Sequence, residues 1–247
     1  MAYFADRMQE SGDSRVISGA VALWMEGTYV KRAVILSLAA LAATSWVSAC
    51  LAENEPVNIV TGTAVVDGKL DEFVKAGALV CYMLGPDFLG STSGIDSAAD
   101  QSGNVYVMYD AKNLYWGADV TDDVLVMERA GGAIWENDAI EIWLDGKQFG
   151  ASVSVDDGLP FVTDWMGVGS TTKAAFAKTA KGWIMEASIS LAELRDAGVD
   201  VVKGNSVQLA LGLDDADTPG GGFEGHLYFP LSWAWGNPAS FATATFK

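Results

Sequence analysis

Short strand-like runs separated by turn residues constrain the fold of this chain more than any other feature of its sequence. They recur from residue 57 to residue 247. In the clearest run, 138–145, aliphatic side chains occupy every second position: Ile140, Ile142 and Leu144. Successive side chains of a strand point to opposite faces, so this aliphatic set faces the core. Glu141 and Trp143 then lie together on the other face, where folding alone does not require an aromatic residue.

The other predicted elements complete an all-β pattern. Further strands are expected at 104–109, 114–120, 153–155, 182–189, 207–214 and 225–231. Asp110–Asn113 is typical of a four-residue hairpin loop. One helix is predicted, at 190–197, where Ser190 and Glu193 have capping-box spacing and Gly198 ends it. With 27 glycines in the chain, this pattern predicts an antiparallel β-sandwich of the jelly-roll or immunoglobulin-like kind with one short helix.

The N-terminal part has the pattern of an export signal. Lys31 and Arg32 precede an apolar stretch of about 16 residues. A helix that spans a membrane needs about 20 residues, so this stretch is too short for one. The alternative is a buried core helix. We interpret 1–30 as an unstructured extension, because Met25 is a better start for a signal. The predicted organisation is this extension, a signal peptide at 31–49, a linker at 50–56 and one domain at 57–247.

Val47-Ser-Ala-Cys50 resembles a bacterial lipobox, in which the cysteine carries the lipid. This resemblance implies an exported lipoprotein of the cell envelope that meets the membrane only through Cys50. Ordinary cleavage after Ala49 or Ala52, giving a secreted protein, is the alternative. Cys81 is expected to be a buried strand thiol, and a Cys50–Cys81 disulfide competes with lipidation.

Charge and composition exclude several functions. Acidic residues outnumber basic ones 32 to 15, so the net charge of −17 disfavours nucleic acid and anionic lipid. Two cysteines and one histidine leave little material for a zinc site or a Ser-His-Asp triad. Carboxylate pairs suited to glycoside hydrolysis arise by chance in so acidic a chain, but none lies in a motif that would raise a pKa. We therefore expect no enzyme.

Five motifs in sequence order resemble the family 9 carbohydrate-binding module. They are the apparent strand Val66-Asp-Gly-Lys-Leu-Asp-Glu-Phe73, the hairpin 107–122, the run 135–145, the strand 182–190, and 207–217 with a closing tryptophan segment. The resemblance covers nearly all of 64–247. It implies a β-sandwich that binds xylan, cellulose or another neutral saccharide during polysaccharide catabolism, often beside a glycoside hydrolase.

The resemblance also implies the sugar-binding residues. Members hold a sugar between two tryptophans, the first of which matches Trp135, while Glu141 matches the carboxylate six residues later. For the second, Trp233 fits slightly better than Trp235, and Asn237 is a neighbouring amide. Two alternatives stay open: Trp135 packs as a lid, and Glu141 is a solvated strand charge. The basic residue that some members use has no aligned match, although Lys147 and Lys173 are available.

Three other tryptophans of this region have an expected place. Trp116 and Trp183 are expected in the core, and Trp143 in either the core or the site.

Two acidic clusters are candidate metal sites: Asp119, Asp122 and Asp123, and Asp214, Asp215 and Asp217. Family members carry structural calcium, which accepts many oxygen ligands, but neither cluster has EF-hand spacing and no cofactor is required.

Two other functions are open. One is electron transfer with haem b, which related sandwiches bind through methionine and histidine or lysine; the available methionines and histidine are Met83, Met108, Met127, Met166, Met185 and His226. The other is a structural envelope lipoprotein without a ligand. His226 alone is typical of a satisfied surface or core imidazole.

Overall fold

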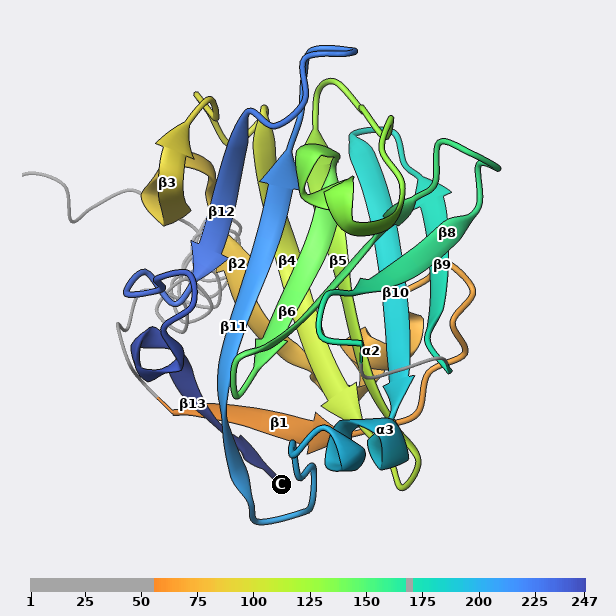
Figure 1. Ribbon diagram of the computed structural model, residues 1–247, viewed down its shortest axis with the longest axis vertical. Helices are drawn as coiled ribbons and strands as arrows, with labels where there is room; N and C mark the ends of the chain where they lie inside the picture. The colour runs from red at the N-terminus through yellow and green to blue at the C-terminus, as the bar shows by residue number, and fades with distance from the viewer. Residues whose placement is uncertain (1–55, 168–170) are drawn as a thin grey trace, which may run out of the picture. The chain divides into compact units, whose positions relative to one another are not determined.

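Thirteen strands form in the residues that the computed structural model describes, 56–167 and 171–247 (Figure 1). They are β1 (Val57–Thr61), β2 (Leu79–Met83), β3 (Leu89–Ser93), β4 (Gln101–Tyr109), β5 (Asn113–Asp122), β6 (Ala139–Leu144), β7 (Lys147–Val153), β8 (Pro160–Asp164), β9 (Lys173–Lys178), β10 (Gly182–Ser190), β11 (Ser206–Asp215), β12 (Gly225–Phe229) and β13 (Ala242–Phe246). The same part of the chain contains short helices: α2 (Asp71–Ala76), α3 (Leu191–Asp196), and the 3₁₀ helices η1 (Gly85–Phe88), η2 (Gly131–Glu136) and η3 (Pro238–Ser240).

The predictions for the N-terminal part lie outside the described residues. They are the extension at 1–30, the signal peptide at 31–49, nearly all of the linker at 50–56, lipidation of Cys50 and the Cys50–Cys81 disulfide. Cys81 itself is fully buried in β2. Within 56–167 and 171–247, no helix has the length and hydrophobicity needed to cross a membrane.

Two sheets pack against each other and share β1. Sheet A has the order β8-β7-β6-β11-β13-β1, with β12 and β3 continuing from the second half of β11. Sheet B has the order β1-β4-β5-β10-β9, with β2 on the free edge of β4. The predicted β-sandwich is confirmed. One detail differs: β1 pairs in parallel with both β13 and β4, whereas the other pairs are antiparallel.

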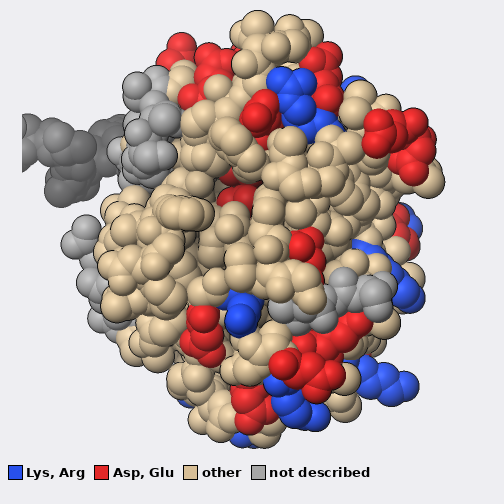
Figure 2. Space-filling view, in the orientation of Figure 1, with Lys and Arg blue, Asp and Glu red and all other residues tan. Residues whose placement is uncertain are grey.

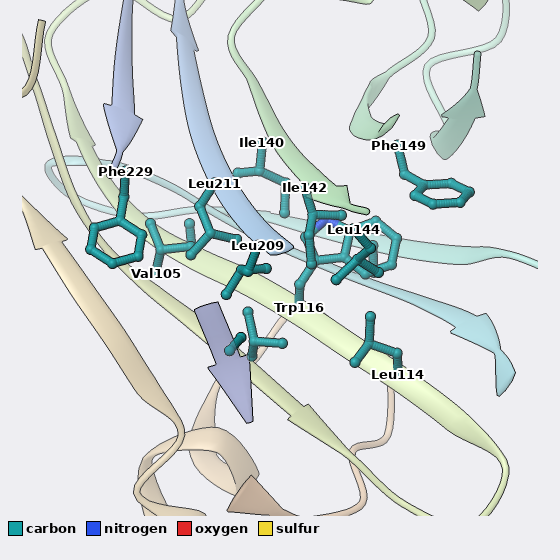
Figure 3. Packing of buried hydrophobic residues seen from close by; sticks show 14 of the residues in the cluster. Val105, Leu114, Trp116, Ile140, Ile142, Leu144, Phe149, Leu209, Leu211 and Phe229 are labelled. Carbon is teal, nitrogen blue, oxygen red and sulfur yellow. The ribbon is translucent and has the colours of Figure 1, made fainter. Parts of the chain in front are cut away.

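The core lies between the two sheets (Figure 3). From sheet A, alternate residues of β6 and β11 point inward, among them Ile142 and Leu211, and meet Val105 and Trp116 of sheet B. Trp116 and Trp183 are fully buried, as predicted. The period-2 pattern of β6 and β11 is therefore confirmed, and it directs Glu141 and Trp143 to the outer face of sheet A.

The local predictions hold for the hairpin and for α3. In the turn between β4 and β5, the Asp110 carboxylate accepts hydrogen bonds from the backbone N–H groups of Lys112 and Asn113, at 2.7 and 2.8 Å. At α3, the Ser190 hydroxyl accepts from the backbone N–H of Glu193 at 3.2 Å. Gly198 follows with a φ of 89°, which stops the helix.

Two local predictions are wrong. The segment interpreted as an opening strand contains helix α2, because Asp71 and Glu72 favour the first turn and Gly77 ends the helix in a left-handed conformation with a φ of 68°. The predicted strand at 153–155 is instead the end of β7 at Val153. The backbone N–H of Ser154 bonds the carbonyl of Leu159, at 2.9 Å, in the turn toward β8.

Candidate functional site

A layer of aromatic rings covers the outer face of sheet A. Trp143 is 3% exposed and packs against Tyr228 and Trp233, with ring centroids 5.6 and 5.4 Å away. The Tyr228 and Trp233 rings stack nearly parallel, 3.7 Å apart. The face opposite the core is thus a second, smaller apolar layer, completed by Ala210 and Phe241.

A pocket of about 320 Å³ lies beside this layer, a volume near the lower end of small-molecule sites, which range over about 300–1,000 Å³. Its lining consists of five aromatic rings and three polar side chains: Trp135, Trp143, Trp165, Tyr228, Trp235, Glu141, Gln148 and His226. The face shown in Figure 2 is mostly uncharged near its centre, and β6, β11 and β12 cross the same part of Figure 1. The pocket is therefore suited to a neutral ligand with both apolar and hydrogen-bonding surface.

Two glycines inside strands make room for the rings. Glu141 of β6 pairs with Gly150 of β7 on one side and with Gly212 of β11 on the other. A Cβ at Gly150 would lie 2.7 Å from the Trp165 ring, and one at Gly212 would lie 3.0 Å from the Tyr228 ring. Because these side chains are absent, both rings lie close against the sheet, one on either side of Glu141.

The indole rings that line the pocket differ in exposure and support. Trp135 is 41% exposed in η2, and Trp235 is 77% exposed in the loop after β12. Trp165 follows β8, and its indole N–H donates to the carbonyl of Gly132 at 2.9 Å. The Thr163 hydroxyl donates to the carbonyl of Gly131 at 2.6 Å, so β8 holds the η2 segment that carries Trp135.

Two of the three polar side chains of the pocket, Glu141 and His226, are buried, and Gln148 is half-buried. Glu141 is 2% exposed and accepts a hydrogen bond from the Gln148 amide at 3.1 Å. Burial raises the pKa of Glu141 well above its ordinary value, with a further contribution from the charge of Asp214. The interpretation of Glu141 as a solvated strand charge is therefore wrong. Buried polar groups that face a pocket favour a ligand that satisfies their hydrogen bonds.

The family model described as "Carbohydrate family 9 binding domain-like" matches residues 66–247. The chain belongs to this family. It therefore contains a non-catalytic carbohydrate-binding domain, which agrees with the expectation that it is not an enzyme.

Two solved structures are similar to this chain in fold, and one relative is similar in sequence. Two are family 9 modules from Caldicellulosiruptor kristjanssonii. The one in complex with cellotriose has a TM-score of 0.57 at 18% identity and covers 78% of this chain and 94% of that one. The glucose complex has a TM-score of 0.56 at 17% identity, with coverage of 78% and 96%. Endo-1,4-beta-xylanase A of Thermotoga neapolitana is 27% identical over 202 residues, which span 73% of this chain but 17% of the xylanase.

The family 9 domain brings some of the predicted site residues together. Trp135, Glu141 and Trp235 line the pocket. Trp233 does not line it and instead supports Tyr228 from within the aromatic layer. Asn237 is exposed in the turn before η3, also outside the pocket lining. Trp143, which was open between core and site, packs in the outer layer and also forms part of the pocket wall.

Sequence reasoning missed four lining residues: Gln148, Trp165, His226 and Tyr228. A signal existed for Trp165 and Tyr228, because a glycine inside a strand marks the close approach of another group. Gly150 and Gly212 are such glycines, although the sequence does not say which ring approaches them.

The predicted acidic clusters are rearranged in the fold. Asp215 and Asp217 join Asp100, which sequence reasoning missed, and Asp217 also joins Asp122 and Asp123. Within each group the candidate ligand atoms lie within 4.8 Å of one another. Two predicted members lie elsewhere, because successive side chains of a strand point to opposite faces of its sheet. Asp119 is exposed on β5, and Asp214 points from β11 toward the pocket side of sheet A.

The rearranged cluster fits a calcium ion. Asp215 is fully buried, and both of its carboxylate oxygens lack a hydrogen-bond partner, as does Oδ1 of Asp217. Burial and neighbouring carboxylates raise the pKa of Asp215 to about 8 and that of Asp217 to about 7. Uncompensated carboxylate oxygens held close together match the hard oxygen ligands that calcium takes in flexible geometry.

Most of the methionines considered for haem binding pack in the core. Met83, Met108 and Met185 are fully buried in the core, Met127 packs against it, and Met166 is 45% exposed. His226 shares its pocket with no methionine among the described lining residues.

Proposed function

We propose that the domain binds neutral oligosaccharides of the cellulose or xylan type, with one sugar ring stacked between Trp135 and Trp235. The observation that carries this proposal is the pocket itself. Two exposed indoles line it together with the buried carboxyl of Glu141 and the half-buried amide of Gln148.

The chemistry of a pyranose matches this pocket. Its C–H faces pack on aromatic rings, and its rim of hydroxyls needs hydrogen bonds, which Glu141 and Gln148 supply. Large rigid aromatic side chains contribute roughly 150–250 Å² each and lose little entropy on binding. A neutral sugar is also unaffected by the net charge of −17. A disaccharide of about 23 heavy atoms at about −0.3 kcal/mol per atom gives roughly −7 kcal/mol, a Kd of order 10 μM.

The similar proteins support the choice of sugar class. The Caldicellulosiruptor kristjanssonii modules were solved with cellotriose and with glucose, and the Thermotoga neapolitana relative is an endo-1,4-beta-xylanase. We extend these sugars to the present chain as a proposal. The same reasoning makes a glycoside hydrolase its partner in polysaccharide catabolism.

Calorimetric titration of the purified chain tests the proposal. With calcium present, cello- and xylo-oligosaccharides are expected to give saturable heats with a Kd between about 10 μM and 1 mM. Sucrose, whose glycosidic linkage blocks both anomeric carbons, serves as the comparison sugar. Absence of binding to every oligosaccharide by a chain with a cooperative melting transition would refute the proposal.

A calcium ion is part of the proposed function. Asp100, Asp215 and Asp217 would hold it, with Asp122 and Asp123 beside them. Its role would be structural: it would neutralise carboxylates that the fold brings together from the residue before β4, the end of β11 and the β11–β12 connection. The chemistry of the donor set supports this, since every ligand atom is a carboxylate oxygen.

Export and anchoring are proposed from the sequence of the N-terminal segment. Cleavage before Cys50 and lipidation of its thiol would place the binding domain on the cell envelope. In a bacterial host fed an alkyne fatty acid, the wild-type chain is expected to become labelled and Cys50→Ser to stay unlabelled. Equal labelling of both chains, or labelling of neither, would contradict anchoring through this residue.

A further inference from the structure

The pocket contains one basic side chain, and it is neither lysine nor arginine. Among the described residues that line the pocket, His226 is the only one with a basic group. Lys147 and Lys173 begin strands β7 and β9 and are not part of the lining. His226 is also the single histidine of the chain.

The His226 imidazole is held from three sides. Its Nδ1 is hydrogen-bonded to Oδ1 of Asp214, which lies opposite it in the β11–β12 register and is fully buried. The ring of Phe223 lies 3.9 Å away and that of Tyr228 4.8 Å away, centroid to centroid. The Asp214 bond and the two ring contacts together restrict the orientation of the imidazole.

This arrangement leaves one ring nitrogen for a ligand. Nδ1 is engaged by Asp214, whereas Nε2 makes no hydrogen bond to any residue within 56–167 and 171–247. His226 is only 8% exposed, so water has limited access to it, and what access it has is on the side of the pocket. A ring nitrogen that faces a pocket without a protein partner is available to exchange bound water for a hydroxyl of a ligand.

We propose that His226 determines which sugar the pocket accepts: its Nε2 bonds one ring hydroxyl of the bound saccharide, and Asp214 is the positioning residue that orients the imidazole. This inference rests on the proposed saccharide binding. A hydroxyl both donates and accepts, so the bond forms with either tautomer of the imidazole. The pocket therefore favours a sugar that has a hydroxyl within hydrogen-bonding distance of Nε2. A sugar that lacks this hydroxyl is expected to bind more weakly.

Deoxy sugars test the role of Nε2. D-glucose and its 1-, 2-, 3-, 4- and 6-deoxy analogues would compete with cellotriose for the wild-type chain in a calorimetric displacement assay. Removal of the hydroxyl that meets Nε2 is expected to weaken binding about 10- to 100-fold, because the nitrogen is left unpaired. In His226→Phe, which keeps an aromatic ring between Phe223 and Tyr228, glucose and that analogue are expected to bind equally.

Further variants separate this role from a structural one. Asp214→Asn keeps the shape of the side chain but loosens the imidazole, and it is expected to reduce the same discrimination without removing it. His226→Gln, of different shape, replaces His226→Phe if the latter does not melt cooperatively. The loss of discrimination at a single hydroxyl is a readout that general destabilisation does not produce.

The outcomes distinguish the two proposals. If the wild-type chain binds no sugar, the proposed function fails and this inference with it. If the wild type binds glucose and every deoxy analogue equally, or if both His226 variants keep the wild-type discrimination, saccharide binding stands and the assignment of His226 is wrong.

Discussion

Replacement of Trp235 by alanine is expected to weaken cellotriose binding by at least about 30-fold, the effect of losing about 2 kcal/mol at a binding hot spot. The indole is 77% exposed, so it contributes little to folding, and its truncation leaves no buried cavity. The free energy of unfolding should therefore change by no more than about 0.5 kcal/mol. Calorimetric titration measures the first quantity and chemical denaturation the second.

Trp233→Ala is the matched control, two residues away in the same loop. Trp233 stacks on Tyr228 at 3.7 Å and packs against Trp143 at 5.4 Å. Its loss is expected to lower the free energy of unfolding by at least about 1 kcal/mol, because it removes aromatic pairs as well as buried area. If Trp235→Ala bound cellotriose as well as the wild type while Trp233→Ala retained full stability but lost binding, the two roles would be reversed.

Removal of calcium is expected to lower the melting temperature by about 5–11 °C. This range follows from about 2.7 kcal/mol of stabilisation at a calcium concentration of 100 times Kd and from about 2–4 °C per kcal/mol for a domain of this size. The physical cause is the carboxylate of Asp215, which is fully buried with neither oxygen paired. Differential scanning calorimetry in excess calcium and in EDTA measures the shift.

Two substitutions locate the calcium effect. Asp215→Asn removes a buried carboxylate ligand from the cluster, so its melting temperature should be nearly the same in calcium and in EDTA. Asp119→Asn removes an exposed charge of β5 and should keep the wild-type shift. A wild-type melting temperature that does not respond to EDTA, or an Asp215→Asn variant that responds fully, would exclude calcium from this cluster.

Features that depend on neighbouring residues along the chain could be predicted from the sequence. The inward set of β6 follows from alternation alone, as does that of β11. The hairpin at Asp110 and helix α3 follow from side chains that bond backbone groups two or three residues away. Helix α2 was missed because six residues carry little periodicity, and its helical signals are the acidic first turn and Gly77.

The set of residues in the site depends on which strands pair with each other, and local sequence patterns do not reveal this pairing. Trp165 reaches the pocket because β8 pairs with β7, where Gly150 leaves room for its ring. Asp100 joins Asp215 across 115 positions of the chain, so clusters chosen by sequence proximity combined the wrong carboxylates. The choice between Trp233 and Trp235 likewise depended on Tyr228, which stacks on the former and leaves the latter exposed.

Indole N–H resonances in a two-dimensional NMR titration with cellotriose test the central claim most directly, because each tryptophan reports separately. Single Trp→Phe variants assign the signals. The signals of Trp135 and Trp235 are expected to shift in a saturable way, whereas those of Trp116 and Trp183, both fully buried in the core, should stay in place. Saturable binding that leaves the Trp135 and Trp235 signals unmoved would contradict a sugar held between these two rings.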